Sequence, residues 1–169
     1  MRYAILAVGL MATAATAQQA TPEWQFYQDD VNTDGLLQAF VQSADGTQLI
    51  LKCDKPGKRK VYAVIVSQEM LAPPYHQDIV RKLMIRFDTG ASREERWRFR
   101  EKTAKAVNAP GERTLTRFLE PLVEASRLEV IIYPSDTAAN PITTSFDVHN
   151  AGPAVEKVYA SCKDESPLG

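Results

Sequence analysis

The tripeptide Asp88-Thr89-Gly90 has the residue types of an aspartic-protease active site. Such an enzyme needs two carboxylates that lie close together and share one proton, so that one activates water while the other acts as an acid. Asp-Thr-Gly occurs once in this chain, so the second carboxylate would have to come from another copy. A homodimeric aspartic protease using Asp88 is therefore the enzymatic alternative for this protein.

The residues around this motif favour a structural interpretation. The chain continues as REERWRFREK (93–102), where such proteases continue with an apolar strand, and FDVHNAG (146–152) places polar residues in the segment that should support the active loop. Arg86 lies two residues before Asp88 and is therefore expected beside it on one strand face. We predict that Asp88 ends a strand and that Gly90 takes the positive φ of the following turn.

A second candidate site is the acidic segment DDVNTDGLLQAF (29–40), in which Asp30, Asn32 and Asp34 have the spacing of calcium ligands in an EF-hand loop. Val41 stands where a bidentate glutamate is expected, and the flanking residues have strand patterns rather than helical ones. A polar turn is the favoured interpretation, and calcium is the alternative. His76 and His149 lie far apart without a neighbouring nucleophile and acid, so no zinc site and no cofactor is predicted.

An arginine-rich strand gives the most distinctive candidate for an interaction surface. Arginine and tryptophan are enriched at the energetic centres of protein interfaces. A solvated face neutralised by nearby glutamates is the competing interpretation. The candidate interaction residues are Arg96, Trp97, Arg98 and Arg100.

The N-terminal residues predict export. Arg2, the apolar run 4–11 and Ala15-Thr16-Ala17 have the order of a bacterial signal peptide with its cleavage site, so residues 1–17 are expected to be removed and residues 18–169 to form one domain. We therefore expect a periplasmic or secreted protein. Its only cysteines, Cys53 and Cys162, lie outside any CxxC motif, so in an oxidising compartment they predict a disulfide.

The charge of the chain excludes one class of partner. With 20 basic and 21 acidic residues, it lacks the basic excess of a dedicated nucleic-acid binder. No run after the signal peptide is long and apolar enough for a transmembrane helix.

Apolar periodicity predicts a β-rich α+β domain. Two-residue alternation and turn residues delimit about seven or eight mostly antiparallel strands, in a sandwich or a partly open barrel. The expected strands are 24–29, 36–43, 47–53, 61–67, 79–88, 95–102, 127–134 and 142–149. Two helices are expected toward the C-terminus, one through residues 115–123 despite Pro121, and one opening at Gly152-Pro153. Cys53 and Cys162 then fall on apolar faces of a strand and of the last helix.

Several of these segments recur in one order over most of the mature chain: LILKC (49–53), IRFDTG (85–90), RFLEPLVEASRLEVIIYP (117–134) and SFDVHNAGPAVEKVYASC (145–162). In this order the chain resembles the VasI-like, type VI secretion-associated proteins and related small exported proteins of Gram-negative bacteria. The resemblance implies a β-rich exported domain with no known catalytic residues. Arg86-Phe87-Asp88 would then be a structural feature of a strand.

The sequence thus predicts an exported protein that binds rather than catalyses, an accessory protein of the cell envelope, and the resemblance adds an association with secretion. Its expected partner is another envelope or secreted protein. The alternatives are the homodimeric aspartic protease using Asp88 and an inhibitor of a periplasmic or host enzyme.

Overall fold

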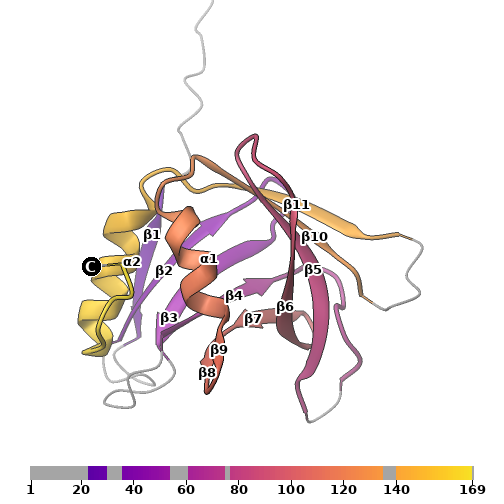
Figure 1. The fold of residues 1–169 in the computed structure, drawn as a ribbon, viewed down its shortest axis with the longest axis horizontal. Helices are drawn as coiled ribbons and strands as arrows, with labels where there is room; N and C mark the ends of the chain where they lie inside the picture. The colour runs from indigo at the N-terminus through magenta and orange to yellow at the C-terminus, as the bar shows by residue number, and fades with distance from the viewer. Residues whose placement is uncertain (1–22, 30–35, 54–60, 75–76, 135–139, 169) are drawn as a thin grey trace, which may run out of the picture.

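Alternating apolar residues build about half of the described chain into strands, and two helices lie in its C-terminal half (Figure 1). The computed structural model describes residues 23–29, 36–53, 61–74, 77–134 and 140–168. The strands are β1 Gln25–Asp29, β2 Leu36–Gln42, β3 Gln48–Cys53, β4 Val61–Val66, β5 Ile79–Phe87, β6 Arg93–Arg100, β7 Thr103–Ala106, β8 Asn108–Ala109, β9 Glu112–Arg113, β10 Arg127–Ile132 and β11 Ile142–Asp147. The helices are α1 Thr114–Leu122 and α2 Ala151–Cys162.

Nine of the strands form one sheet in the order β1-β2-β3-β4-β7-β6-β5-β10-β11. All its described pairings are antiparallel, so the predicted β-rich class with two C-terminal helices is confirmed. The strands belong to a single sheet rather than to two packed sheets, and the sheet is not closed into a barrel. The short strands β8 and β9 form a separate hairpin just before α1.

Both helices cover the same face of this sheet, which we call the inner face. Trp97 of β6 meets Phe118 of α1 edge to face, with ring centroids 5.1 Å apart. Cys53 of β3 and Cys162 of α2 form a disulfide with Cα atoms 5.8 Å apart, and both residues are buried. The cross-link that the sequence predicts is therefore present, and it fastens the last helix to the sheet.

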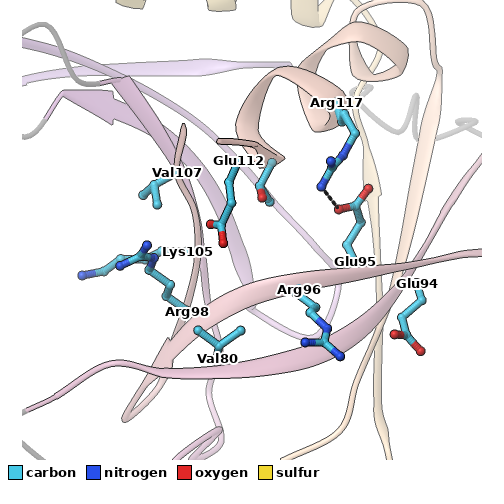
Figure 2. Close-up of a pocket in the computed structure, with 10 residues that line it drawn as sticks. Val80, Glu94, Glu95, Arg96, Arg98, Lys105, Val107, Glu112 and Arg117 are labelled. Atoms are coloured by element: carbon cyan, nitrogen blue, oxygen red, sulfur yellow. Dashed lines mark hydrogen bonds and ion pairs between the residues drawn. The ribbon is translucent and has the colours of Figure 1, made fainter. Parts of the chain in front are cut away.

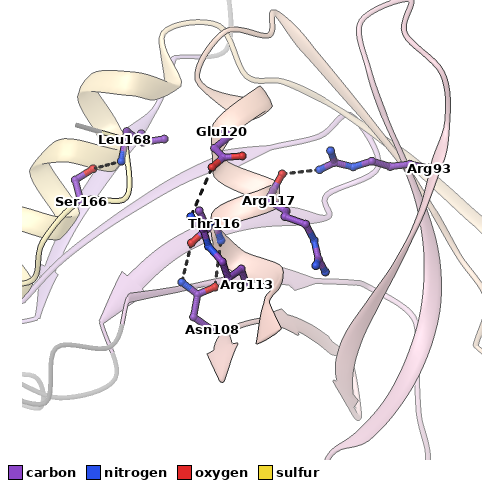
Figure 3. A network of polar contacts seen from close by, with 8 residues as sticks. All are labelled: Arg93, Asn108, Arg113, Thr116, Arg117, Glu120, Ser166 and Leu168. Atoms are coloured by element: carbon purple, nitrogen blue, oxygen red, sulfur yellow. Dashed lines mark hydrogen bonds and ion pairs between the residues drawn. The ribbon is translucent and has the colours of Figure 1, made fainter. Parts of the chain in front are cut away.

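Helix α1 contains a proline that removes one of its helical hydrogen bonds. Pro121 has no N–H, so the carbonyl oxygen of Arg117, four residues earlier, lacks its helical donor. The guanidinium of Arg93 on β6 donates to this oxygen at 2.7 Å (Figure 3). The helix predicted for this segment thus includes Pro121, and a side chain from the sheet fills the hydrogen-bonding position that the proline leaves open.

The start of α1 is also capped from outside the helix. The side chain of Arg113, the residue before the helix, makes no capping bond. Instead, Oδ1 of Asn108 accepts a hydrogen bond from the Thr116 amide at 3.2 Å, and Nδ2 of Asn108 donates to Thr116 Oγ1 at 2.9 Å (Figure 3). These bonds hold the β8–β9 hairpin against the helix.

The predicted strands are wrong at the bounds of β6 and in the omission of β7, β8 and β9. The turn after β5 ends at Ser92, so β6 begins at Arg93 rather than at residue 95. The short strand β7, Thr103–Ala106, is not predicted because its alternate buried residues, Ala104 and Ala106, have little β propensity.

Candidate functional site

Strand β6 places opposite kinds of side chain on its two faces. Trp97 and Phe99 point inward and are fully buried, as is most of Glu95. The outer face carries Arg96, Arg98 and Arg100, of which Arg96 and Arg100 are exposed and Arg98 is partly buried. The two-residue period of the strand thus separates the tryptophan from the three arginines.

The prediction that Trp97 is an interaction residue is therefore wrong. Its exposed fraction is 0%, and its ring packs against Phe118 in the core. A tryptophan between arginines resembles an interface centre in the sequence, but alternate residues of a strand face opposite sides of the sheet. The candidate interaction surface is reduced to the arginines.

The sheet adds a cation that sequence reasoning missed. Lys105 of β7 lies directly opposite Arg98 on the outer face. Like charges at directly opposed positions repel and destabilise a sheet by about 0.2–1 kcal/mol. The alternation of Lys105 with the buried residues Ala104 and Ala106 was the only signal in the sequence that could have revealed it.

A second opposed pair lies in the next row, where Lys82 of β5 faces Arg96. Lys82 is neutralised by Glu94, with Nζ and Oε2 3.1 Å apart. No ion pair within the described part of the chain engages the cationic cluster, which we define as Arg96, Arg98, Arg100 and Lys105.

The acidic residue closest along the strand is occupied elsewhere. Glu95 is 5% exposed and lies 3.4 Å from Arg93 Nε and 3.4 Å from Arg117 Nη2. These contacts hold β6 to α1 on the inner face. Glu95 therefore neutralises the two arginines that anchor the helix, and not those on the outer face.

Two hollows flank Lys105. One, of about 420 Å³, lies over the outer face of β3, β4 and β7 and includes Lys52, Tyr62 and Arg100 in its lining. The other, of about 360 Å³, lies between β6 and the start of α1 and includes Arg96 and Arg98 (Figure 2). Figure 2 shows Glu112 and Arg117 on the side of this opening across from β6. The cluster thus borders space in which a ligand group can be received.

Asp88 contacts backbone amides instead of Arg86, the neighbour that the sequence predicts. It lies just beyond β5 with a φ of 47°, and Oδ1 accepts hydrogen bonds from the amides of Ser126 at 3.0 Å and Arg127 at 2.8 Å. Arg86, the expected neighbour, instead pairs with Glu129 at 2.8 Å because these residues are directly opposed on β5 and β10. Asp88, rather than Gly90, takes the positive φ of the turn.

The remaining candidate residues, those for calcium binding and the two histidines, add no functional cluster to the described part of the structure. Asp30, Asn32, Asp34 and His76 lie outside the described residues. His149 is exposed in the turn before α2, where its amide donates to Asp147 Oδ1 at 3.1 Å. Among the residues that the structure describes, no group of three or more His, Cys, Asp or Glu side chains is arranged to hold a metal ion.

Comparisons of the chain with protein-family models, with curated proteins and with solved structures find no match. The resemblance to the VasI-like proteins therefore stays a prediction. Within the described part of the chain, no helix has the length and apolar character needed to cross a membrane.

Proposed function

We propose that this protein is an exported, non-catalytic binding protein that holds an acidic partner protein on its cationic cluster. The observation that carries the proposal is the direct opposition of Arg98 and Lys105 on one sheet face without an acidic partner among the described residues. Folding places these like charges side by side at a cost in stability. Carboxylates of a partner would remove that repulsion.

The cluster does not follow from the overall charge. The chain carries a net charge of −1, so a surface with four cations in neighbouring positions is a local excess. Local excess of one sign attracts opposite charge and accelerates association, and it does so most strongly at low ionic strength. The signal peptide predicts export to the periplasm or out of the cell. The partner is therefore expected to be another envelope or secreted protein.

Binding of a fluorescently labelled, end-capped peptide of alternating threonine and glutamate tests the proposal. We expect the dissociation constant to rise steeply with salt, and to rise by about tenfold or more in Arg98→Glu and in Lys105→Glu. Lys157→Glu is the matched control, because Lys157 is an exposed cation on α2, where it lies over the ring of Phe26. The proposal fails if all three variants bind the peptide alike, or if the same peptide with lysine in place of glutamate binds equally well.

A stability measurement gives independent support. Lys105→Gln removes the like-charge repulsion with Arg98, so its free energy of unfolding should rise by about 0.2–1 kcal/mol while its peptide binding weakens. Lys157→Gln, which loses the contact with the Phe26 ring, should neither raise the free energy of unfolding nor weaken peptide binding. If the cationic cluster is a binding site whose like charges lower stability, Lys105→Gln raises stability and weakens binding together. If the cluster is only a solvated face, Lys105→Gln does not weaken binding.

A further inference from the structure

Strand β6 has an open edge beside the cationic cluster. On one side it pairs with β5 from Arg93 to Phe99. On the other side only Arg98–Arg100 pair with β7, because β7 leaves β6 beyond Lys105 while it continues along β4 to Ala106. The segment Glu94–Trp97 therefore has a neighbouring strand on one side only, as far as the described pairings extend.

The lining of the 360 Å³ hollow shows that it lies at this edge. Glu94, Glu95 and Arg96 all line it, although consecutive residues of a strand point to opposite faces of the sheet. A cavity on either face would contact only alternate residues, so a cavity that contacts all three opens onto the edge of the strand. Val107 and Glu112 line it from the chain that has left β6 (Figure 2).

The backbone of β6 presents hydrogen-bonding groups to this opening. Arg100 and Thr103 close the two-residue turn between β6 and β7, so their N–H and C=O groups face each other. Counting back by twos along the antiparallel strand, the same groups of Arg98, Arg96 and Glu94 point to this side. Those of Arg98 meet β7, and those of Arg96 and Glu94 point into the opening.

The far wall of the opening is fixed. Asn108 and Thr116 join the β8–β9 hairpin to α1 through their two hydrogen bonds. Glu95 joins β6 to α1 through Arg93 and Arg117, whose Nη2 lies 3.4 Å from the carboxylate. These contacts hold β6 and the chain beyond β7 in fixed positions on the two sides of the opening.

We infer that an extended, acidic segment of the partner protein adds as an antiparallel strand to β6 along Glu94–Trp97. Unpaired backbone groups at a strand edge are a template for an incoming strand, and such addition is a recurring mode of peptide recognition. Directly opposed residues of two strands share a face, so a residue opposite Arg96 lies on the outer face, beside Arg98 and Lys105. The cationic cluster selects a carboxylate at that position. Strand addition rests on the function proposed above and specifies how the partner is held.

Backbone methylation of the probe peptide separates strand addition from charge attraction alone. In an antiparallel strand, a glutamate opposite Arg96 must direct its own N–H toward β6, so the threonine–glutamate peptide with N-methyl groups on every glutamate cannot add in this orientation with its carboxylates outward. The same peptide with N-methyl groups on every threonine keeps the required N–H groups. We expect the first to bind about tenfold or more weakly than the second, which should match the unmethylated peptide.

Two variants test the edge itself. Glu94→Pro removes the N–H that faces the opening, and it leaves the bonds to β5 intact because those come from the alternate residues. It should reduce the difference between the two methylated peptides, because the groups of Arg96 remain, whereas Glu94→Gln, which loses the same carboxylate, should keep the difference in full. Hydrogen exchange in the unaltered protein gives a second readout, in which saturating unmethylated peptide should slow exchange of the Glu94 and Arg96 amides at least tenfold.

The possible outcomes separate the two proposals. If both methylated peptides bind equally and still depend on Arg98 and Lys105, strand addition is wrong while the cationic binding function stands. If none of the acidic peptides binds, both proposals are wrong. Unchanged exchange at Glu94 and Arg96 in a saturated complex would also overturn strand addition.

Discussion

Asp88 and Arg127 bind each other through a reciprocal pair of hydrogen bonds. The Asp88 amide donates to the Arg127 carbonyl oxygen at 2.9 Å, and Asp88 Oδ1 accepts from the Arg127 amide at 2.8 Å. The same Oδ1 accepts from the Ser126 amide at 3.0 Å. The end of β5 is thereby fastened to the connection between α1 and β10, and the residue that resembles a catalytic aspartate joins two segments 39 positions apart.

Asp88→Ala should therefore lower the free energy of unfolding by about 1–3 kcal/mol, because it removes a charged acceptor from two backbone amides. Asp88→Asn should lose less, since its carbonyl oxygen can accept the same bonds and asparagine tolerates a positive φ. Thr89→Ala, an exposed neighbour in the same tripeptide, is the control, and urea unfolding is the measurement. Equal stability of all three variants would contradict the assigned role. An acid peptidase activity that Asp88→Asn abolishes would instead support the enzymatic alternative.

The bridge between Cys53 and Cys162 spans 109 positions of sequence. Cross-linking so long a loop restricts the unfolded chain and contributes about 4–5 kcal/mol in the chain-entropy treatment. The double variant Cys53→Ala with Cys162→Ala should lose about this much stability in urea, and the reduced protein should unfold like the variant. Thiol titration of the unfolded, unreduced protein should find no free thiol. Two free thiols would disprove the bridge.

The turn between β2 and β3 should make stability depend on pH through Asp45. Partial desolvation of Asp45 acts to raise its pKa, but hydrogen bonds from Ser43 and Thr47 outweigh this effect and hold the pKa below its ordinary value. A carboxyl whose pKa is lower in the folded state stabilises the protein above its unfolded pKa of about 3.9, and this stabilisation is lost as the pH falls through the folded pKa.

Asp45→Asn should accordingly be less stable than the unaltered protein above about pH 5, and the difference should shrink toward acid pH. Ser43→Ala, which removes one of the hydrogen bonds to the carboxylate, should show a smaller pH-dependent loss. Urea unfolding at a series of pH values measures both. A difference that stays constant down to the acid limit would show that Asp45 does not stabilise the turn through its charge.

The contact between Arg93 and helix α1 predicts coupling with Pro121. Arg93→Met removes the donor to the Arg117 carbonyl oxygen, and it should cost about 1–3 kcal/mol because that oxygen has no helical donor. In a Pro121→Ala background an amide N–H is again available to the oxygen, so the same substitution should cost less. A double-mutant cycle in urea gives the coupling energy. Additive losses would show that Arg93 acts only through Glu95 and through the ring of Phe87.

The sequence alone determined eight of the strands and both helices, because local alternation of apolar residues sets the face that each segment must bury. The apolar spacing Leu115, Phe118, Leu119 and Leu122 predicted α1 even though Pro121 lies within it. The inward positions of Cys53 and Cys162 predicted their cross-link in the same way. β7 escaped prediction because its inward residues are only alanines, which carry a weak apolar signal.

The site depended on pairings between segments distant in the sequence, which local patterns do not encode. Register placed Lys105 opposite Arg98 and Glu129 opposite Arg86. The pleat placed Trp97 in the core and its neighbouring arginines on the outer face. The departure of β7 from β6 left the edge at Glu94–Trp97 open. The sequence thus determined which residues each strand carries on either face, whereas only the tertiary structure decided which of them meet, because strand register arises from contacts across the whole sheet.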